Sequence, residues 1–310
     1  MPPPSLPVPP HRPSPDPDGP EGRLLTALVC AAVEPGLSGV LLFDLPPELV
    51  TPVADLFTRL LDLTAVPVAG AAGASVPRTV RTVLGAATRD EDLWIRPRLR
   101  RGPDHVVFSL APGPLTEPDP GPSLAVVPDL ARLGVTGMRA VVQLLGADVA
   151  TVEHSGLRHR WRPRTRWLAV CRTEDTERVS PHLLDRFPVR LPVAGLRTLP
   201  AAPDDPLGPV GPLPGAWRAV LEQTAAGHPP LTVSAALAPR VLALLGPGTG
   251  HRRALALARI ARALTRLDGA TEVTADRAGQ AARLIGLASA PPSPRARPRR
   301  PPRPRAPPPP

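Results

Sequence analysis

Side chains that could carry chemistry are few in this sequence, and their spacing matches no common catalytic or metal-binding pattern. Neither a Gly-x-Ser-x-Gly nor a Cys-x-x-Cys motif is present, so an unrelated hydrolase or a dithiol enzyme has no support. Cys30 and Cys171 lie in apolar runs, where a small buried side chain is expected rather than a disulfide. No two histidines have the His-x-x-x-His spacing that places two metal ligands on one face of a helix; those considered are His105, His154, His159, His182, His228 and His251. We therefore expect no metal site.

The basic residues carry the next signal, because all 37 are arginine and the sequence contains no lysine. Only 3% of the residues are aromatic and none is tyrosine, which leaves few rings on which bases could stack. Sequence-specific nucleic-acid binding is therefore not expected. Weak nonspecific contact is predicted through the C-terminal tail, which holds six arginines: Arg295, Arg297, Arg299, Arg300, Arg303 and Arg305.

The elements that must position any functional residue begin with a helix, a buried strand and a second helix. Apolar periodicity predicts them over Glu21–Val33, Gly39–Phe43 and Leu49–Leu63. A nucleotide-binding α/β domain begins in this order. Three more strands follow and alternate with helices, as in a parallel sheet. They are Leu124–Val127, Arg166–Val170 and Val189–Val193. A hairpin is predicted over residues 149–159, between the first and second of them.

The character of the chain changes after a segment rich in proline and glycine, residues 198–214. Helical periodicity then predicts Trp217–Ala226, Ser234–Leu245, His251–Leu267 and Thr274–Leu287, the last with Thr274 as N-cap. The predicted division is a disordered Pro-rich N-terminus (1–20), an α/β core (21–197), a linker (198–214), an all-helical domain (215–288) and a disordered Pro/Arg-rich tail (289–310).

Two motifs in this order of elements resemble the AAA+ ATPase subunits of magnesium chelatase, and especially their degenerate D-type subunit. The segment Pro181–Phe187 (Pro-His-Leu-Leu-Asp-Arg-Phe) is similar to one family signature, and Gly250–Arg252 with residues 258–276 is similar to the start and body of the family's lid. The resemblance covers residues 21–287. It implies an α/β fold, an AAA+ P-loop-type parallel sheet domain followed by a small all-helical lid domain.

The resemblance also locates a phosphate loop that has lost its working residues. A working loop needs glycines, a lysine for the β and γ phosphates, and a hydroxyl for Mg²⁺. Here Asp44 takes the place of the first glycine, Val50 replaces the lysine, and Thr51 alone keeps its hydroxyl. Asp129 stands in the slot of the family's catalytic glutamate. Thr51 and Asp129 are thus remnants of a nucleotide site, and no tightly bound cofactor is expected in this chain.

Two arginines of the resembling motifs are the residues that the family uses at nucleotide. Arg186 matches an arginine that points across a subunit interface at the ATP of a neighbour, where a guanidinium offsets charge on the γ-phosphoryl group. Arg252 matches a lid arginine that contacts nucleotide. The alternatives are an Asp-Arg pair that caps a short helix for Arg186, and a solvated basic helix start for Arg252.

The resemblance therefore implies a non-catalytic platform subunit that joins an active AAA+ ATPase subunit in a hetero-oligomeric ring. ATP and Mg²⁺ would lie on that partner, and the complex would insert Mg²⁺ or Co²⁺ into a tetrapyrrole. We expect no ATPase activity from the chain alone. No window reaches the 18 or more apolar residues of a membrane span, so a cytoplasmic protein is expected.

Two alternatives remain at this point. One is a MoxR-like ATPase or chaperone that binds nucleotide in an atypical way. The other is a frameshifted fragment of a longer D-type subunit, because D-type subunits continue from an acidic Pro-rich linker into an integrin-like domain, whereas the linker that begins here near Ala290 is basic.

Overall fold

The computed structural model describes residues 19–65, 68–70, 73–75, 77–101, 105–116, 121–154, 157–197, 199, 213–245, 250–285 and 287. Disorder was expected for residues 1–20 and 289–310. Residues 1–18 and 289–310 and most of the linker 198–214 lie outside the described residues, whereas Pro20 is the first residue of a helix and Gly19 is its N-cap. Within the described part of the chain, no helix is both long and apolar enough to cross a lipid bilayer.

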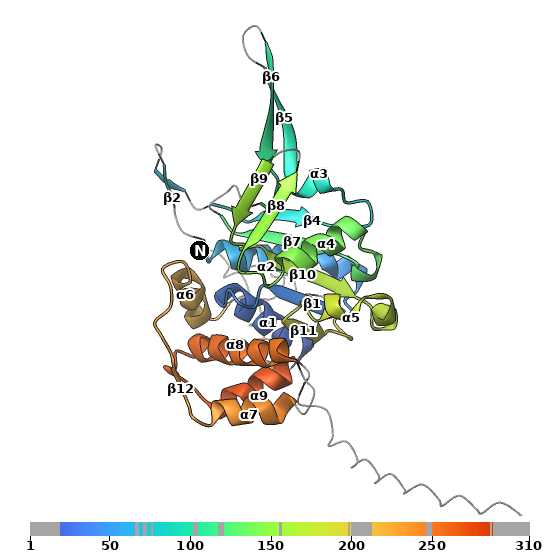
Figure 1. Ribbon diagram of the computed structural model, residues 1–310. Helices are drawn as coiled ribbons and strands as arrows, with labels where there is room; N and C mark the ends of the chain where they lie inside the picture. The colour runs from blue at the N-terminus through green and yellow to red at the C-terminus, as the bar shows by residue number, and fades with distance from the viewer. Residues whose placement is uncertain are drawn as a thin grey trace, which may run out of the picture.

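A five-stranded parallel sheet forms the centre of the molecule (Figure 1). Its strand order is β11-β1-β10-β7-β4, so the first strand lies between two strands that come much later in the chain. Each neighbouring pair is parallel, with Val40 beside Leu168 on one flank and Val189 on the other. The strands are β1 (Gly39–Phe43), β4 (Val80–Val83), β7 (Ser123–Val127), β10 (Arg166–Cys171) and β11 (Val189–Pro192).

Helices cover both faces of this sheet because the residues of its inner strands alternate between two apolar clusters. In β1, Val40 and Leu42 belong to the cluster beneath α1 (Pro20–Val33) and α2 (Val50–Asp62), whereas Leu41 belongs to the cluster beneath α4 (Val135–Leu144) and α5 (Pro181–Leu184). Buried strands of a parallel sheet are apolar on both faces for this reason. The α/β layering expected from the sequence is confirmed.

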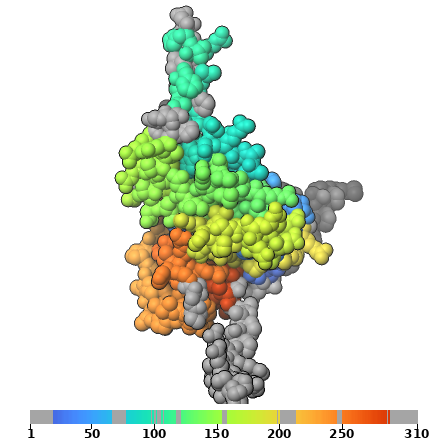
Figure 2. Space-filling model, turned by 45° about the vertical axis from the view of Figure 1, so that its right-hand side comes forward, coloured from blue at the N-terminus to red at the C-terminus, as the bar shows by residue number. Residues whose placement is uncertain are grey.

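Antiparallel hairpins extend from the sheet between its strands. The predicted hairpin is confirmed as β8 (Ala150–His154) paired with β9 (Leu157–Trp161). A longer hairpin, β5 (Ile95–Arg101) with β6 (Val106–Pro112), was not predicted; it follows α3 (Asp90–Leu93) and projects from the body in both views (Figures 1 and 2). A small third hairpin joins β2 (Val68–Gly70) to β3 (Gly73–Ser75).

The C-terminal part is helical, as expected, with one addition. Its helices are α6 (Gly215–Gln223), α7 (Leu237–Leu245), α8 (His251–Leu267) and α9 (Ala275–Leu284). A short parallel pair, β12 (Thr232–Val233) with β13 (Glu272–Val273), also lies in this part, so it is not all-helical. Thr274 takes the predicted N-cap position of α9, but its side chain makes no capping hydrogen bond.

The helical part is packed on α1 rather than separated from the core. One apolar cluster includes residues of α1, α2 and β1 together with residues of α6 to α9. Glu34, which follows α1 and is 6% exposed, is held by Arg266 at 3.0 Å and Arg262 at 3.5 Å, both from α8. Arg23 of α1 also donates to the carbonyl of Leu284 in α9 (3.1 Å). These contacts fix where α8 begins relative to the sheet.

Candidate functional site

The end of β1 carries a carboxylate where the resembling family has a glycine. Asp44 has a φ of +59°, in the left-handed region where aspartate is tolerated better than most residues. Its Oδ1 accepts a hydrogen bond from the backbone N–H of Thr173 (2.8 Å), and its Oδ2 accepts one from Thr173 Oγ1 (2.5 Å). Asp44 thus ties the end of β1 to the residue that follows β10.

The loop after Asp44 offers few donors to a phosphate group. Pro46 and Pro47 have no backbone N–H, and Leu49 donates its own to the carbonyl of Pro46 (2.9 Å) within the short 3₁₀ turn η1 (Pro47–Leu49). Thr51 is exposed in the first turn of α2. A phosphate cradle needs several N–H groups aimed at one point, and the hydrogen bonding of this loop does not provide it.

Asp129 caps a turn at the same edge of the sheet. It follows β7, and its Oδ1 accepts hydrogen bonds from the backbone of Ala131 (3.0 Å) and Arg132 (3.3 Å) at the start of η2 (Leu130–Arg132). Its other oxygen lies 3.4 Å from Arg132 Nε. The carboxylate therefore caps the N-terminus of this turn.

The pKa of Cys171 reports the charge at this edge. Cys171 ends β10 and is 1% exposed, and its pKa is raised to about 11 by burial first and then by the carboxylates of Asp129, Asp175 and Asp44. Three negative side chains therefore lie near the end of β10. In the described part of the chain, no group of three or more histidine, cysteine and acidic side chains could hold a metal ion. We call the end of the sheet where β1, β7 and β10 finish the carboxyl edge, and the end where the strands begin the amino edge.

Arg186 lies at the opposite edge, in the turn between α5 and β11. Proline at the first position starts α5, and Leu183 and Phe187 are both buried, with 3% and 1% exposed. These two side chains, four residues apart, hold the turn on the sheet and leave Arg186 at the surface of a hollow.

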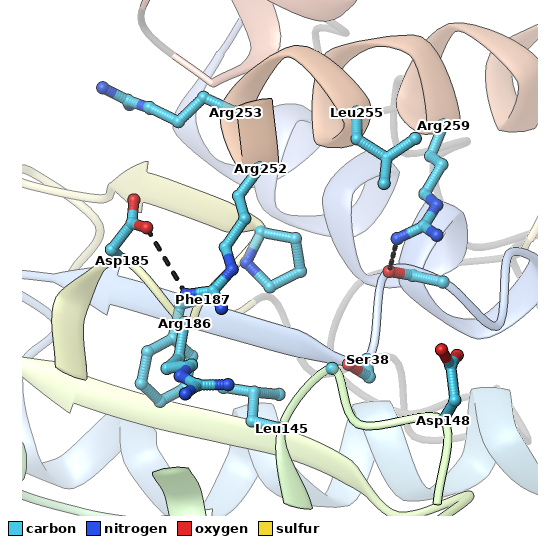
Figure 3. A pocket seen from close by; sticks show the side chains of 13 residues that line it. Ser38, Leu145, Asp148, Asp185, Arg186, Phe187, Arg252, Arg253, Leu255 and Arg259 are labelled. Atoms are coloured by element: carbon cyan, nitrogen blue, oxygen red, sulfur yellow. Dashed lines mark hydrogen bonds and ion pairs between the residues drawn. The ribbon is translucent and has the colours of Figure 1, made fainter. Parts of the chain in front are cut away.

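A cavity of about 250 Å³ gathers four arginines at this amino edge (Figure 3). Arg186 comes from the turn before β11, while Arg252, Arg253 and Arg259 come from α8. The first turn of α8 points the Arg252 side chain down toward Arg186 (Figure 3). The two arginines that the sequence selected, 66 positions apart, thus line one cavity.

Asp185 is the main counter-charge in this cavity. Its Oδ1 lies 3.1 Å from Arg190 Nη2 and its Oδ2 lies 3.6 Å from Arg252 Nη1. Among the described residues it forms ion pairs with these two arginines and not with Arg186, so the Asp-Arg pair considered from sequence is not what the structure shows. Burial and then the charge of Arg252 lower the pKa of Arg186. An anion placed between Arg186 and Arg252 would relieve this repulsion.

Gly36 completes the wall of the cavity. A Cβ at this position would lie 2.4 Å from Arg259 Nε, so the glycine lets Arg259 pass close to the backbone and donate to the Gly36 carbonyl at 2.9 Å. Asp185, Arg190, Arg259 and Thr173 were not singled out from sequence. Only Asp185 carried a signal, since it lies inside the motif with Arg186.

The two edges cannot serve one ligand. Asp44 follows the last residue of β1, whereas Gly36 precedes β1 and Arg186 precedes the parallel strand β11. Five strand residues at about 3.3 Å each separate the edges by roughly 15 Å. Arg186 and Arg252 therefore face away from the chain's own loop, and an anion that they bind would come from outside this chain.

Comparison with known proteins adds information on fold. No family model matches the sequence, and no curated protein matches it. Among solved structures, a predicted ATPase from Cytophaga hutchinsonii matches with a TM-score of 0.57 at 12% identity, over 86% of this chain and 84% of that chain. A full-length MCM homolog from Methanopyrus kandleri matches with a TM-score of 0.55 at 15% identity, over 86% of this chain and 55% of that chain. With the parallel sheet and the helical part described above, these likenesses show that the chain has an AAA+ ATPase-like fold.

Proposed function

We propose that this chain is a non-catalytic AAA+ subunit that joins an active ATPase and presents Arg186 and Arg252 to nucleotide bound by that neighbour. The observation that carries the proposal is the placement of the two arginines together at the amino edge, about one strand length from the chain's own altered loop. Arginine is suited to this role because its planar guanidinium binds phosphate oxygens in pairs.

The state of the carboxyl edge supports the non-catalytic part of the proposal. Asp44 and Thr173 are bonded to each other, and Asp129 is engaged with a turn. A triphosphate arriving there would meet three carboxylates and few free N–H groups. We infer that the chain binds no nucleotide tightly and that ATP with Mg²⁺ resides on the partner, in a ring of both subunits.

The finer assignment is to a chelatase-type complex that inserts Mg²⁺ or Co²⁺ into a tetrapyrrole. It rests on the family resemblance of the sequence motifs Pro181–Phe187 and Gly250–Arg252, whose arginines Arg186 and Arg252 line one cavity. The AAA+ ATPase subunit of such a complex, from the same source, is therefore the partner to test first.

The test is reconstitution with that ATPase subunit. Arg186→Ala and Arg252→Ala are each compared with the intact chain, and Arg240→Ala, an exposed arginine on α7, is the matched control. Equal assembly is first confirmed by light scattering. Loss of a trans-acting arginine costs on the order of 10³ in rate at the affected site, so total ATP turnover should fall in proportion to the interfaces that this subunit supplies. Turnover equal to that of Arg240→Ala, with equal assembly, would refute the role of the arginines.

A second candidate is a MoxR-like ATPase that binds nucleotide in an atypical way. It is favoured by the match to the predicted ATPase from Cytophaga hutchinsonii, which extends over 84% of that chain. The two candidates differ in a single measurement, because only the second predicts that the isolated chain hydrolyses ATP. Hydrolysis that disappears in Thr51→Ala would favour the second candidate.

A further inference from the structure

The hairpin of β5 and β6, here called the arm, has two chemically different faces. Residues directly opposite each other in an antiparallel pair share a face, and successive residues alternate. The pairing of Leu99 with Phe108 and of Arg98 with Ser109 therefore places the apolar pair and the arginine on opposite faces. By the same register Leu110 and Val106 share the face of Phe108, and Arg96 shares the face of Arg98. Arg101 is opposite Val106 and therefore ends the apolar face with a charge.

The apolar face of the arm is open to solvent. Its side chains keep large exposed fractions: 73% for Leu99, 63% for Phe108, 62% for Val106 and 38% for Leu110. They all belong to the arm, which stands clear of the body in the space-filling view (Figure 2). Apolar side chains grouped in this way mark a contact surface more often than single exposed ones do.

The base of the arm is firmly held in the core. Trp94 and Ile95 are 5% and 3% exposed, and Gly113 donates to the carbonyl of Trp94 at 2.7 Å. Trp94 also meets Trp161 at the end of β9, with ring centroids 6.3 Å apart. The second hairpin therefore supports the first, and the exposed face is presented on a fixed element.

Positive charge is concentrated at the hairpins. Residues 95–112 and 150–164 together contain eight arginines and two acidic residues, and residues 289–310 contain six arginines and no acidic residue. The remainder of the chain has 23 arginines and 25 acidic residues, so the body carries no positive excess. The arm thus joins an apolar face to the basic region of the folded chain.

We propose that the arm docks on an anionic lipid surface. Leu99, Phe108 and Val106 would enter the boundary between headgroups and acyl chains, while Arg96 and Arg98 on the opposite face reach lipid phosphates. A peripheral element with one apolar and one arginine-bearing face has this affinity for anionic bilayers. The long arginine side chain allows its charge to stay at the headgroup level. This inference is independent of the proposed function and requires no membrane-spanning segment.

Both properties of the arm select a lipid surface over other occupants. Nucleic acid would satisfy the arginines but offers no apolar phase for aliphatic side chains such as Leu99 and Val106. A second copy of the arm would cover the apolar face, but seven residues per strand give a face of only about 230 Å², well below the roughly 800 Å² per partner of a stable interface. An anionic bilayer supplies both an apolar layer and phosphates and needs no matching groove.

Vesicle flotation of the full chain tests the proposal. The probes are phosphatidylcholine vesicles with and without about 30 mol% phosphatidylglycerol. We expect binding to the anionic vesicles and at least a roughly tenfold weaker partition for the double variant Leu99→Ser, Phe108→Ser. Leu242→Ser, on α7 and 67% exposed, is the matched control and should bind like the intact chain. The tail is unchanged in every variant, so its arginines cannot account for a difference. Equal binding by the double variant would overturn the proposal.

A face-resolved label gives a second test. Cys30 and Cys171 are both buried, so a bimane dye can be directed to a new cysteine at Leu99→Cys or at Ser109→Cys. Anionic vesicles should shift the emission of the Leu99 label to the blue and leave the Ser109 label nearly unchanged. Equal shifts at both positions would contradict a face-specific contact. Binding of a duplex DNA that Arg96→Gln with Arg98→Gln abolishes, without vesicle binding, would assign the arm to nucleic acid and overturn the proposal.

Discussion

The two edges of the central sheet have opposite chemistry although the same strand, β1, connects them. At the carboxyl edge, Asp44 is bonded to Thr173, and the nearby carboxylates raise the pKa of Cys171. At the amino edge, four arginines line an open cavity and Arg186 has a lowered pKa beside Arg252. The carboxylates of Asp44 and Asp129 at the first edge accept hydrogen bonds within the chain, whereas at the second edge Arg186 and Arg252 lie near each other and, among the described residues, share only the carboxylate of Asp185.

This difference indicates which edge the fold keeps for a ligand. Polar groups whose hydrogen bonds are made within the chain, such as the carboxylates of Asp44 and Asp129, contribute to folding and need no ligand. Like charges held together lower stability unless a ligand of opposite charge arrives, so their presence points to binding. The comparison predicts that substitutions at the two edges, and in the contacts that hold α8 beside the amino edge, will differ in their effects on the free energy of unfolding and on the ATP turnover of a partner subunit.

The largest expected effect comes from the support of the amino edge, Glu34→Gln. Glu34 holds Arg266, which is 12% exposed in its side chain, and removing the negative charge leaves a buried guanidinium unpaired. Breaking one side of a buried ion pair costs about 3 kcal/mol, and urea denaturation should show a loss of that size. Asp55→Asn is the control, because the Arg81–Asp55 pair is 37% and 46% exposed and should cost less than about 1 kcal/mol. Equal losses would mean that α8 is not anchored by Glu34.

A smaller effect is expected from alkaline pH at the carboxyl edge. The pKa of Cys171 lies at about 11 in the fold against an ordinary 9.0, so folding favours the neutral thiol. Its contribution is complete below pH 9.0 and is lost as the pH rises toward about 11. Burial also raises the pKa of Cys30, so the Cys171 share is measured by comparing the intact chain with Cys171→Ala.

The ultraviolet absorbance of the thiolate, taken as the difference between the intact chain and Cys171→Ala, measures the ionisation of Cys171 directly. It should titrate near pH 11, and Asp44→Asn should move the midpoint downward because one of the three negative neighbours is removed. A midpoint at or below 9.0 would show that the edge is not acidic.

Sequence reasoning located most of the regular elements because their apolar patterns are strong. β1, β7 and β10 are apolar on both faces, and α8 has clear helical periodicity. The arm was missed because arginine at alternate positions and Pro97 hide a strand whose one apolar face remains in solvent. The bond between Asp44 and Thr173 was also missed. Those residues are 129 positions apart, and only the pairing of β1 with β10 brings them together.

The convergence of Arg186 and Arg252 needed the structure as well. The sequence motifs selected each arginine through a family resemblance, but not their common cavity, because the packing of α8 on α1 depends on contacts such as Glu34 with Arg266. Thr51 and Asp129 followed β1 and β7 as expected. Their positions at the carboxyl edge follow from the parallel direction of the strands, which the alternation of strands and helices predicted, whereas the strand order itself was not predicted.

A still smaller change in stability is expected for Arg186→Ala in the isolated chain. Among the described side chains Arg186 forms no ion pair, and its charge is opposed by Arg252, so its removal should alter the free energy of unfolding by no more than about 0.5 kcal/mol. Asp185→Ala should cost about 1 kcal/mol because it deprives Arg190 and Arg252 of their carboxylate. If Arg186→Ala were the more destabilising change, Arg186 would be a structural residue.

The smallest effect is expected for Asp44→Gly, because its two consequences oppose each other. Glycine adopts the φ of +59° more readily than aspartate, which stabilises the fold by about 1 kcal/mol. The same change removes two hydrogen bonds to Thr173, each worth about 1 kcal/mol at most in a partly exposed site. The midpoint of thermal unfolding should therefore stay close to that of the intact chain. The variant should also bind no more ATP than the intact chain when measured by calorimetry. Pro46 and Pro47 still lack backbone N–H donors, and Val50 still stands in place of the lysine. Micromolar ATP binding by Asp44→Gly would show that the Asp44 carboxylate alone prevents nucleotide from binding at the carboxyl edge. The contrast between the two edges would then depend on one residue.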